Sequence, residues 1–148
     1  MGGKSGGDAE KQDMILVDTS VWIDFLLGRD TRHRHLLHQF IEEEEDVCIT
    51  EIILTEILQG IRDDALLATT KKYLLEFPVI KPKGTETYIK AAEIFRKCRK
   101  QGKTIRKTID CIIASIAIEN NFTLLHNDSD FEVIEKFSGL RTGNEIFL

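Results

Sequence analysis

Short apolar runs alternate along this chain with longer segments in which apolar residues recur at helical spacing. The runs have the composition of strands buried on both faces, as in a parallel sheet. They cover residues 14–17, 47–49, 78–80 and 122–125, and a last edge strand is expected over residues 145–148. The longer segments predict helices over residues 31–45, 51–61, 66–75, 85–101, 108–120 and 131–137. Strands that alternate with helices predict a three-layer α/β/α sandwich around a mostly parallel sheet of four to five strands.

Local signals mark the boundaries of two of these helices. Gly102 follows the helix over residues 85–101, and glycine favours the left-handed backbone conformation in which many helices end. Thr108 is a candidate N-cap for the helix over residues 108–120, because its hydroxyl can accept a hydrogen bond from a free backbone N–H.

The composition suits one globular domain of ordinary size, with 148 residues of which 42% are hydrophobic. Residues 1–13 contain four of the ten glycines and, beyond Met1, no large apolar side chain. We therefore expect a disordered extension or an expression remnant over residues 1–13, and a folded domain over residues 14–148.

No feature of the sequence indicates a membrane or an oxidising compartment. No apolar run approaches the ~18 residues that span a bilayer, and the N-terminus lacks the apolar stretch of a signal peptide. The three cysteines, Cys48, Cys98 and Cys111, are odd in number and lack the spacing of metal ligands. We expect a cytoplasmic protein with reduced, buried cysteines and no membrane partner.

Charge is segregated along the chain, although the net charge of −5 at first argues against a nucleic-acid partner. Residues 96–107 contain seven basic residues and no acid: Arg96, Lys97, Arg99, Lys100, Lys103, Arg106 and Lys107. Residues 42–46 are five consecutive acids, which we expect to form a solvated helix end. The distribution of charge thus leaves room for an anionic partner that the net charge alone would exclude.

Acidic residues follow two of the predicted strands. Asp18 comes directly after the run over residues 14–17, and Asp128 and Asp130 come shortly after the run over residues 122–125. Ligands of open parallel sheets bind beyond the carboxyl ends of the strands, so these acids would share one edge if both strands are central. The alternative is that each carboxylate only caps the helix that follows it, which aspartate does well.

Two further acids fall on apolar helix faces. Glu56 lies between Ile52 and Ile53 on a helical projection, where an ionised carboxylate is costly unless it is paired or bound to a metal. Asp110 is the one charged residue in the first turn of a helix that is apolar nearly all round, and such a helix should be buried. An alternative for Glu56 is a basic partner from elsewhere in the chain. For Asp110, we favour a functional role because buried acids without partners are rare.

Together these acids suggest one chemistry. Clustered carboxylates repel one another unless a cation lies among them, and ligands that are all oxygen suit Mg²⁺ or Mn²⁺. Such an ion can generate a hydroxide-like nucleophile and stabilise charge on a phosphoryl oxygen. The nearby basic run makes hydrolysis of a phosphodiester the reaction that the sequence predicts.

Four segments of the chain resemble the successive motifs of PIN-domain nucleases, most of all the VapC-type toxins of toxin–antitoxin pairs. They are residues 18–24, 55–60, 110–115 and 127–131, and the resemblance covers essentially residues 14–148. It implies that Asp18, Glu56 and Asp110 are acids of a metal site. It also implies a fourth acid from residues 127–131, for which we favour Asp128 with Asp130 as the alternate.

The same resemblance implies further properties of this chain. Ser20, or alternatively Thr19, is similar to the hydroxyl residue that supports the first acid of the family. The substrate would be a structured RNA, and the protein would form a homodimer inhibited by a cognate antitoxin. The tail of that antitoxin could insert a basic residue into the acidic pocket.

The end of the basic run is the expected path of the RNA. Lys103, Arg106 and Lys107 lie shortly before Asp110, and the backbone of an RNA must approach several carboxylates there. Contacts of lysine and arginine with phosphates give affinity without sequence preference. The alternatives are that these residues only solubilise a loop, or that Arg29, Arg32 and Arg34 provide the phosphate contacts instead.

Other classes of protein fit less well. A haloacid-dehalogenase-like phosphatase would have a second aspartate where Ser20 stands, and a metal-dependent adhesion module would have a serine where Trp22 stands. A catalytically lapsed PIN fold that only binds RNA or partners remains a third alternative, which the four retained acids disfavour.

Several other patterns indicate structure more than chemistry. The histidines His33, His35 and His38 suit a solvated basic helix start better than a zinc site. Trp22, with Phe25 and Leu26, suits either the core or a dimer interface. For Asp24, more than one helical turn beyond Asp18, we expect a role outside the direct metal ligands.

Overall fold

Five short parallel strands form the centre of the computed structural model, which describes residues 14–143 of the chain. The strands are β1 (Ile15–Val17), β2 (Val47–Thr50), β3 (Val79–Ile80), β4 (Thr123–Leu125) and β5 (Arg141–Thr142). Their order in the sheet is β3-β2-β1-β4-β5. The predicted extension over residues 1–13 and the predicted strand over residues 145–148 lie outside the described residues.

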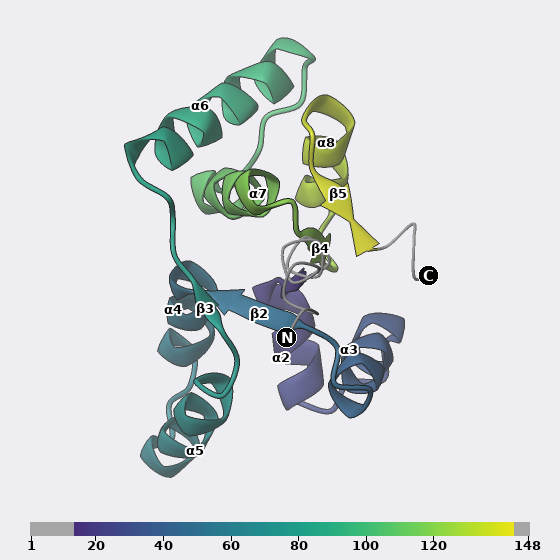
Figure 1. The fold of residues 1–148 in the computed structure, drawn as a ribbon, viewed down its shortest axis with the longest axis vertical. Helices are drawn as coiled ribbons and strands as arrows, with labels where there is room; N and C mark the ends of the chain where they lie inside the picture. The colour runs from purple at the N-terminus through teal and green to yellow at the C-terminus, as the bar shows by residue number, and fades with distance from the viewer. Residues whose placement is uncertain (1–13, 144–148) are drawn as a thin grey trace, which may run out of the picture.

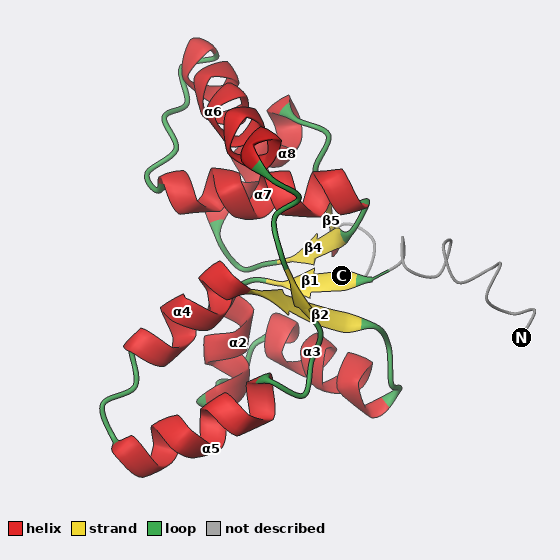
Figure 2. Cartoon of the chain, turned by 60° about the vertical axis from the view of Figure 1, so that its left-hand side comes forward, coloured by secondary structure: helices red, strands yellow, loops and turns green. Residues whose placement is uncertain are grey.

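Helices cover both faces of this sheet, which confirms the predicted three-layer sandwich (Figures 1 and 2). One layer contains α2 (Thr19–Leu26), α3 (Arg32–Glu42), α4 (Glu51–Gln59) and α5 (Asp64–Leu74). The other layer contains α6 (Thr85–Lys100), α7 (Thr108–Asn120) and α8 (Ser129–Phe137). The sequence pattern predicted each of these helices except α2. It also set the start of α8 about two residues too late.

The core lies against both faces of the central strand. All three residues of β1 are buried, and Leu16 is in register with Cys48 on one side and Leu124 on the other. Trp22 on α2 is fully buried, and its ring lies 5.2 Å from the ring of Phe77. Trp22 is therefore a core residue, which removes it from any dimer interface. The cysteines Cys48, Cys98 and Cys111 are free and buried, as predicted.

The prediction is confirmed at the end of α6 and is wrong at the start of α7. Gly102 follows α6 with a φ of 79°, the left-handed conformation that its position after the helix predicts. However, the N-cap of α7 is Lys107, and no side chain makes a capping hydrogen bond there. The prediction of Thr108 as the N-cap was wrong, because Thr108 is already the first residue of the helix.

The order of the strands sets a reversal point at the carboxyl edge of the sheet. From β1 the chain continues to β2 and β3 on one side, whereas β4 and β5 pair on the other side. The strand order thus reverses between β1 and β4, the point at which open parallel sheets bind their ligands. A hydrogen bond of 2.9 Å from the Asp18 N–H to the Leu125 carbonyl continues the pairing of the two strands to this edge.

Candidate functional site

Asp18 lies at the carboxyl end of β1 and is the N-cap of α2. The Ser20 hydroxyl donates a hydrogen bond of 2.8 Å to Asp18 Oδ2, and the Ser20 N–H donates to the same oxygen at 3.2 Å. Ser20 Oγ in turn accepts a hydrogen bond of 3.0 Å from the N–H of Asn127, beyond the end of β4. Ser20 therefore connects the acid after β1 to the loop after β4, and Thr19 does not contact Asp18 in this way.

Asp18 is only 4% exposed. Burial raises the pKa of its carboxyl, the hydrogen bonds from Ser20 oppose this effect, and the nearby charge of Glu56 adds to it. Two carboxylates this close make the ionisation of each other less favourable. A bound cation would remove that repulsion.

Glu56 projects from α4 toward the same edge and is half-buried. The hydroxyl of Thr19 donates a hydrogen bond of 2.6 Å to Glu56 Oε1. The two hydroxyl residues that follow Asp18 thus hold different acids, Ser20 the first and Thr19 the second. No lysine or arginine pairs with Glu56 among the ion pairs of residues 14–143.

Three further acids meet beyond β4. Asp110 lies in the first turn of α7, Asp128 is the N-cap of α8, and Asp130 lies in the first turn of α8. One carboxylate oxygen from each of the three lies within 4.8 Å of the other two. The Asp130 N–H donates a hydrogen bond of 2.9 Å to Asp128 Oδ1. Asp128 therefore caps α8 and also belongs to the acidic cluster.

Asp110 has the most perturbed environment of these acids. It is 1% exposed, and its Oδ2 is buried with no hydrogen-bond partner among the described residues. Burial raises the pKa of its carboxyl to about 7 even though Lys107 opposes the shift, and the charges of Asp18, Asp128 and Asp130 add to the rise. Asp110 therefore lies within the electrostatic reach of both the acid after β1 and the acids after β4.

Basic side chains lie directly on this cluster. Lys107 Nζ lies 3.8 Å from Asp110 Oδ1 and 3.9 Å from Asp128 Oδ2. Arg106 Nε donates a hydrogen bond of 3.2 Å to Asp130 Oδ2, and its Nη2 lies 3.5 Å from Asp128 Oδ1. Two of the three basic residues expected on the RNA path thus contact the acids themselves, whereas Lys103 is exposed in the preceding loop.

The residues of this edge fit a divalent cation. Every candidate ligand is a carboxylate oxygen, the donor type that Mg²⁺ and Mn²⁺ prefer. Asp110 Oδ2 is a buried acceptor without a partner, and the Lys107 ammonium between Asp110 and Asp128 marks a position that favours positive charge. Asp110, Asp128 and Asp130 could hold such an ion. Among the described residues, the predicted ligands Asp18 and Glu56 lie outside this group, although the charge of Asp18 acts on Asp110 and that of Glu56 acts on Asp18.

Two further residues lie beside the site, Asp24, for which a role outside the direct ligands was expected, and His126, which was not predicted. Asp24 is 6% exposed and accepts hydrogen bonds from Asn127 Nδ2 at 3.4 Å and Thr31 Oγ1 at 3.3 Å, so it supports the loop after β4 from outside the cluster. His126 is 1% exposed, and its Nδ1 accepts a hydrogen bond of 3.2 Å from the Asp128 N–H. His126 directly follows β4 as Asp18 follows β1, a signal that could have identified it.

Burial keeps the His126 ring neutral. Burial and, to a lesser extent, the nearby ring of His33 together lower the pKa of the imidazole to about 4. Two of the three histidines predicted to be solvated are so: His35 lies 2.6 Å from Asp30 and His38 lies 3.4 Å from Glu42, all on exposed side chains. His33 differs, because it is half-buried and its Nε2 has no hydrogen-bond partner among the described residues. No group of three or more potential ligands that includes a histidine occurs within residues 14–143.

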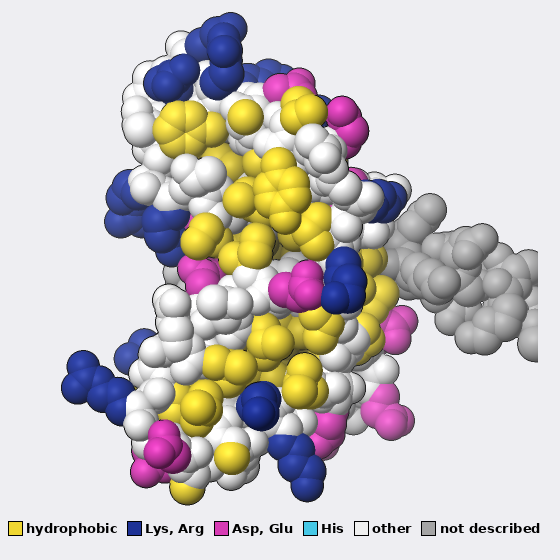
Figure 3. All heavy atoms as spheres, turned by 90° about the vertical axis from the view of Figure 1, so that its left-hand side faces the viewer, with side chains coloured by type: hydrophobic (Ala, Val, Ile, Leu, Met, Phe, Trp, Pro, Cys, Tyr) yellow, Lys and Arg dark blue, Asp and Glu magenta, His cyan; other side chains and the backbone are white. Residues whose placement is uncertain are grey.

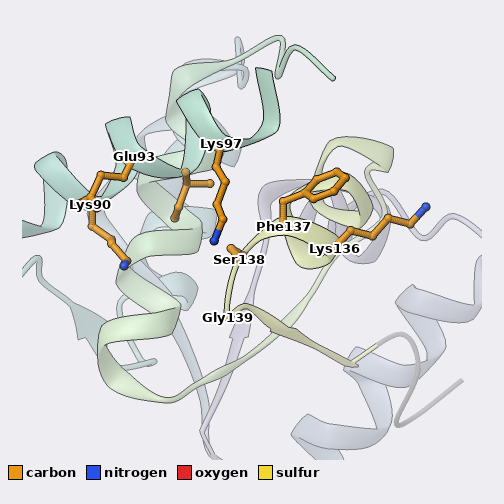
Figure 4. A pocket seen from close by; sticks show the side chains of 8 residues that line it. Lys90, Glu93, Lys97, Lys136, Phe137, Ser138 and Gly139 are labelled. Carbon is orange, nitrogen blue, oxygen red and sulfur yellow. The ribbon is translucent and has the colours of Figure 1, made fainter. Parts of the chain in front are cut away.

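A cavity of about 350 Å³ lies between α6 and the end of α8, away from the acids (Figure 4). Lysines of α6 line it, and Figure 4 shows Lys97 pointing into it above Ser138. None of the clustered acids lines this cavity, so we assign it no part in the chemistry.

Comparison with known proteins agrees with this geometry. The sequence matches the PIN domain over residues 15–136. Ribonuclease VapC11 of Mycobacterium tuberculosis is 30% identical over 132 residues, which cover 88% of this chain and 98% of that protein.

Solved structures share the fold. VapBC2 from Rickettsia felis, bound to a DNA fragment from its promoter, has a TM-score of 0.69 at 17% identity and covers 87% of this chain and 96% of that chain. A toxin–antitoxin complex from Klebsiella pneumoniae has a TM-score of 0.63 at 21% identity and covers 79% of this chain and 89% of that chain. At these identities the likeness shows the fold alone.

Proposed function

This chain belongs to the PIN-domain family and, within it, to the VapC ribonucleases, and from this premise we propose that it is an endoribonuclease dependent on Mg²⁺ or Mn²⁺. The single observation that carries the proposal is the cluster at the reversal point of the sheet. There Asp110, Asp128 and Asp130 bring their oxygens within 4.8 Å of one another, and Asp110 is electrostatically coupled to Asp18. Such a concentration of buried negative charge is unfavourable without a cation.

The chemistry follows from the ligand set. A divalent ion bound by carboxylates activates water as a nucleophile and stabilises the charge of a phosphoryl oxygen. Asp18 lies close enough to Asp110 for its charge to raise the pKa of that carboxyl, and Ser20 orients Asp18 through a hydrogen bond. We propose that Glu56, which accepts a hydrogen bond from Thr19, would orient or deprotonate the attacking water.

Asp128 is the better candidate than Asp130 for the fourth acid. Asp128 Oδ2 and Asp110 Oδ1 face the same Lys107 ammonium, so the two oxygens converge on one position that suits a cation. Asp130 Oδ2 instead accepts hydrogen bonds from both the backbone N–H and Nε of Arg106, which commits it to a supporting role.

The test is cleavage of RNA by the purified chain with and without divalent metal. We expect cleavage with Mg²⁺ or Mn²⁺ and none after treatment with a chelator. Asp18→Asn and Asp110→Asn should each lower kcat by at least about a thousandfold, because both remove a ligand charge where the transition state gains charge. Asp130→Asn should cost much less than Asp128→Asn. Undiminished cleavage in the chelator, with trace metal excluded, would refute the proposal.

We further propose that the protein is the toxin of a toxin–antitoxin pair in the cytoplasm. The supporting observations are the likeness to VapBC complexes and the acidic cluster, which would accept a basic side chain of an antitoxin tail. In residues 14–143, no helix is both long enough and apolar enough to cross a membrane. A small DNA-binding protein encoded in the adjacent upstream reading frame, which binds this chain and stops its RNA cleavage, would support the proposal. Failure of that protein to inhibit cleavage would contradict it.

A further inference from the structure

Lys107 occupies an unusual position for a lysine. It is the N-cap of α7, where a side chain that accepts hydrogen bonds is preferred and where the helix dipole disfavours positive charge. No capping hydrogen bond from a side chain replaces the missing acceptor. The stability of α7 therefore does not explain a lysine here, and the explanation must come from the groups that surround its ammonium.

Those groups are the acids of the candidate metal site. Lys107 Nζ lies 3.8 Å from Asp110 Oδ1 and 3.9 Å from Asp128 Oδ2, and the charges of Glu56 and Asp18 also act on it. These contacts are longer than a hydrogen-bonded ion pair, and the Lys107 side chain is 51% exposed. The ammonium is thus attracted by several carboxylates without being locked to any one of them.

Arg106 is held differently, although it also contacts these acids. Its Nε and its backbone N–H both donate to Asp130 Oδ2, at 3.2 Å and 3.4 Å. A planar guanidinium fixed by directional hydrogen bonds keeps its geometry, whereas an ammonium on a flexible four-carbon stem can move while its backbone stays in place. Of the two neighbouring cations, Lys107 leaves the cluster more easily, because its contacts of 3.8 Å and 3.9 Å are not hydrogen bonds, although the Arg106 side chain is the more exposed of the two.

We propose that Lys107 is a displaceable internal cation that neutralises the acids in the metal-free protein and contacts the phosphate backbone of RNA in the metal-loaded protein. A divalent ion bound to Asp110 and Asp128 repels the ammonium from the position between them, and the exposed side chain turns outward to the edge where RNA arrives. The second half of this inference, the contact with RNA, rests on the proposed ribonuclease function. The first half, the neutralisation of the acids in the metal-free protein, does not, because it concerns metal binding without RNA.

The two halves predict effects of opposite sign for one substitution. Lys107→Gln removes a charge that competes with the ion, so the affinity for Mn²⁺ should rise by about three- to tenfold, as expected for a half-exposed charge near 4 Å. The same substitution removes a contact to phosphate, so kcat/KM for RNA at saturating Mn²⁺ should fall by about tenfold. A merely structural role would lower both quantities, because a distorted site binds metal and RNA less well.

Isothermal titration with Mn²⁺ alone, followed by cleavage of an RNA oligomer, tests both halves. Lys97→Gln is the matched control, since it removes one charge from the same basic run in the cavity away from the acids and should leave Mn²⁺ affinity unchanged. Lys107→Arg should retain most of the activity, and Lys107→Met provides a second uncharged variant. Circular dichroism should show that each variant folds, because the Lys107 side chain is half exposed.

The outcomes separate this inference from the proposed function. Unchanged or weaker Mn²⁺ binding in both Lys107→Gln and Lys107→Met overturns the displaceable cation, whatever the wild-type protein does to RNA. Tighter Mn²⁺ binding with wild-type kcat/KM at saturating metal overturns the contact to phosphate. A wild-type protein that binds Mn²⁺ but cleaves no RNA overturns the ribonuclease proposal, and with it the second half of the inference, while the Mn²⁺ titration still decides the first half.

Discussion

Asp110 shows how one residue couples function to stability. Its pKa in the folded protein is about 7, above the ordinary value of 3.8, so folding favours the protonated carboxyl. The resulting stabilisation is complete below pH 3.8 and is lost as the pH rises to about 7. Above about pH 7 the metal-free protein therefore carries a buried, ionised carboxylate that opposes folding.

Asp110→Asn should relieve this cost. In a chelator at pH 8, we expect the free energy of unfolding to rise by about 1–3 kcal/mol, because the amide keeps the size of the side chain without its charge. At pH 4 the difference should largely vanish. Urea unfolding at the two pH values measures the effect. A variant that is less stable than the wild type at pH 8 would show that Asp110 is paired with a cation more strongly than its contact with Lys107 suggests.

Ser20 is the residue whose substitution should separate Asp18 from the loop after β4. Its hydroxyl donates to Asp18 Oδ2 at 2.8 Å and accepts from the Asn127 N–H at 3.0 Å. Ser20→Ala should lower the metal affinity by about 10- to 100-fold, because groups that orient a ligand have effects of this size. It should also lower the free energy of unfolding by about 1 kcal/mol.

Thr19→Val is the comparison for Ser20→Ala. It removes the hydrogen bond to Glu56 but leaves both contacts of Asp18 in place. Calorimetric titration with Mn²⁺ should therefore give a smaller loss of affinity for Thr19→Val. Equal losses in the two variants would mean that Ser20 has no particular role in orienting Asp18.

At the scale of elements, the short connection from α6 to α7 controls where the basic residues lie. Gly102 follows α6 with a φ of 79°, and six residues later α7 begins at Thr108, close to Asp110. Gly102→Ala should lower the free energy of unfolding by about 1 kcal/mol, because a Cβ is strained in the left-handed conformation even though no atom lies within 4 Å of it.

Gly60 provides the matched control at the end of α4. Its φ is −84°, and a Cβ there would lie 3.6 Å from the Ile57 carbonyl oxygen, an ordinary contact. Gly60→Ala should be neutral or stabilise the protein by about 0.5 kcal/mol, because alanine restricts the unfolded chain. Thermal unfolding of both variants tests this prediction. Equal destabilisation would show that the loss of stability in Gly102→Ala does not come from the backbone conformation at Gly102.

At the scale of the whole molecule, the expected homodimer needs an apolar surface other than Trp22, which is buried. Figure 3 shows hydrophobic side chains gathered on the face that α6 and α7 form, and a second group over α4 and α5. On the first of these, Tyr88 is 48% exposed and lines a groove with Phe95 and Ile112. Exposed apolar surface of this kind is typical of an interface.

We expect light scattering to give the mass of a dimer at micromolar concentration, and Tyr88→Glu to shift it toward the monomer. The physical reason is that a buried carboxylate without a partner in an apolar interface is costly. Lys90→Glu on the same helix, which lines the cavity between α6 and α8 instead, should leave the dimer intact. A monomeric wild-type protein would contradict the prediction directly.

Sequence reasoning reached the class of fold and most of its elements, because these depend on patterns of neighbouring residues. Apolar runs predicted four strands, and helical spacing predicted six of the helices. Asp18 stood out by its position after a strand, and Asp110 by its apolar surroundings. It missed α2, whose residues carry both the first acid motif and a core tryptophan, so that no simple amphipathic face marks the helix.

The tertiary structure decided which side chains meet. The sequence left Thr19 and Ser20 as alternatives for one role, and the structure gives each an acid of its own, because α4 brings Glu56 within 2.6 Å of Thr19. It also placed Arg106 and Lys107 on the carboxylates themselves. Periodicity specifies only the face that a residue shares with its sequence neighbours. Contacts between side chains from distant parts of the chain depend instead on the strand order β3-β2-β1-β4-β5. This order brings residues about a hundred positions apart together at one edge of the sheet.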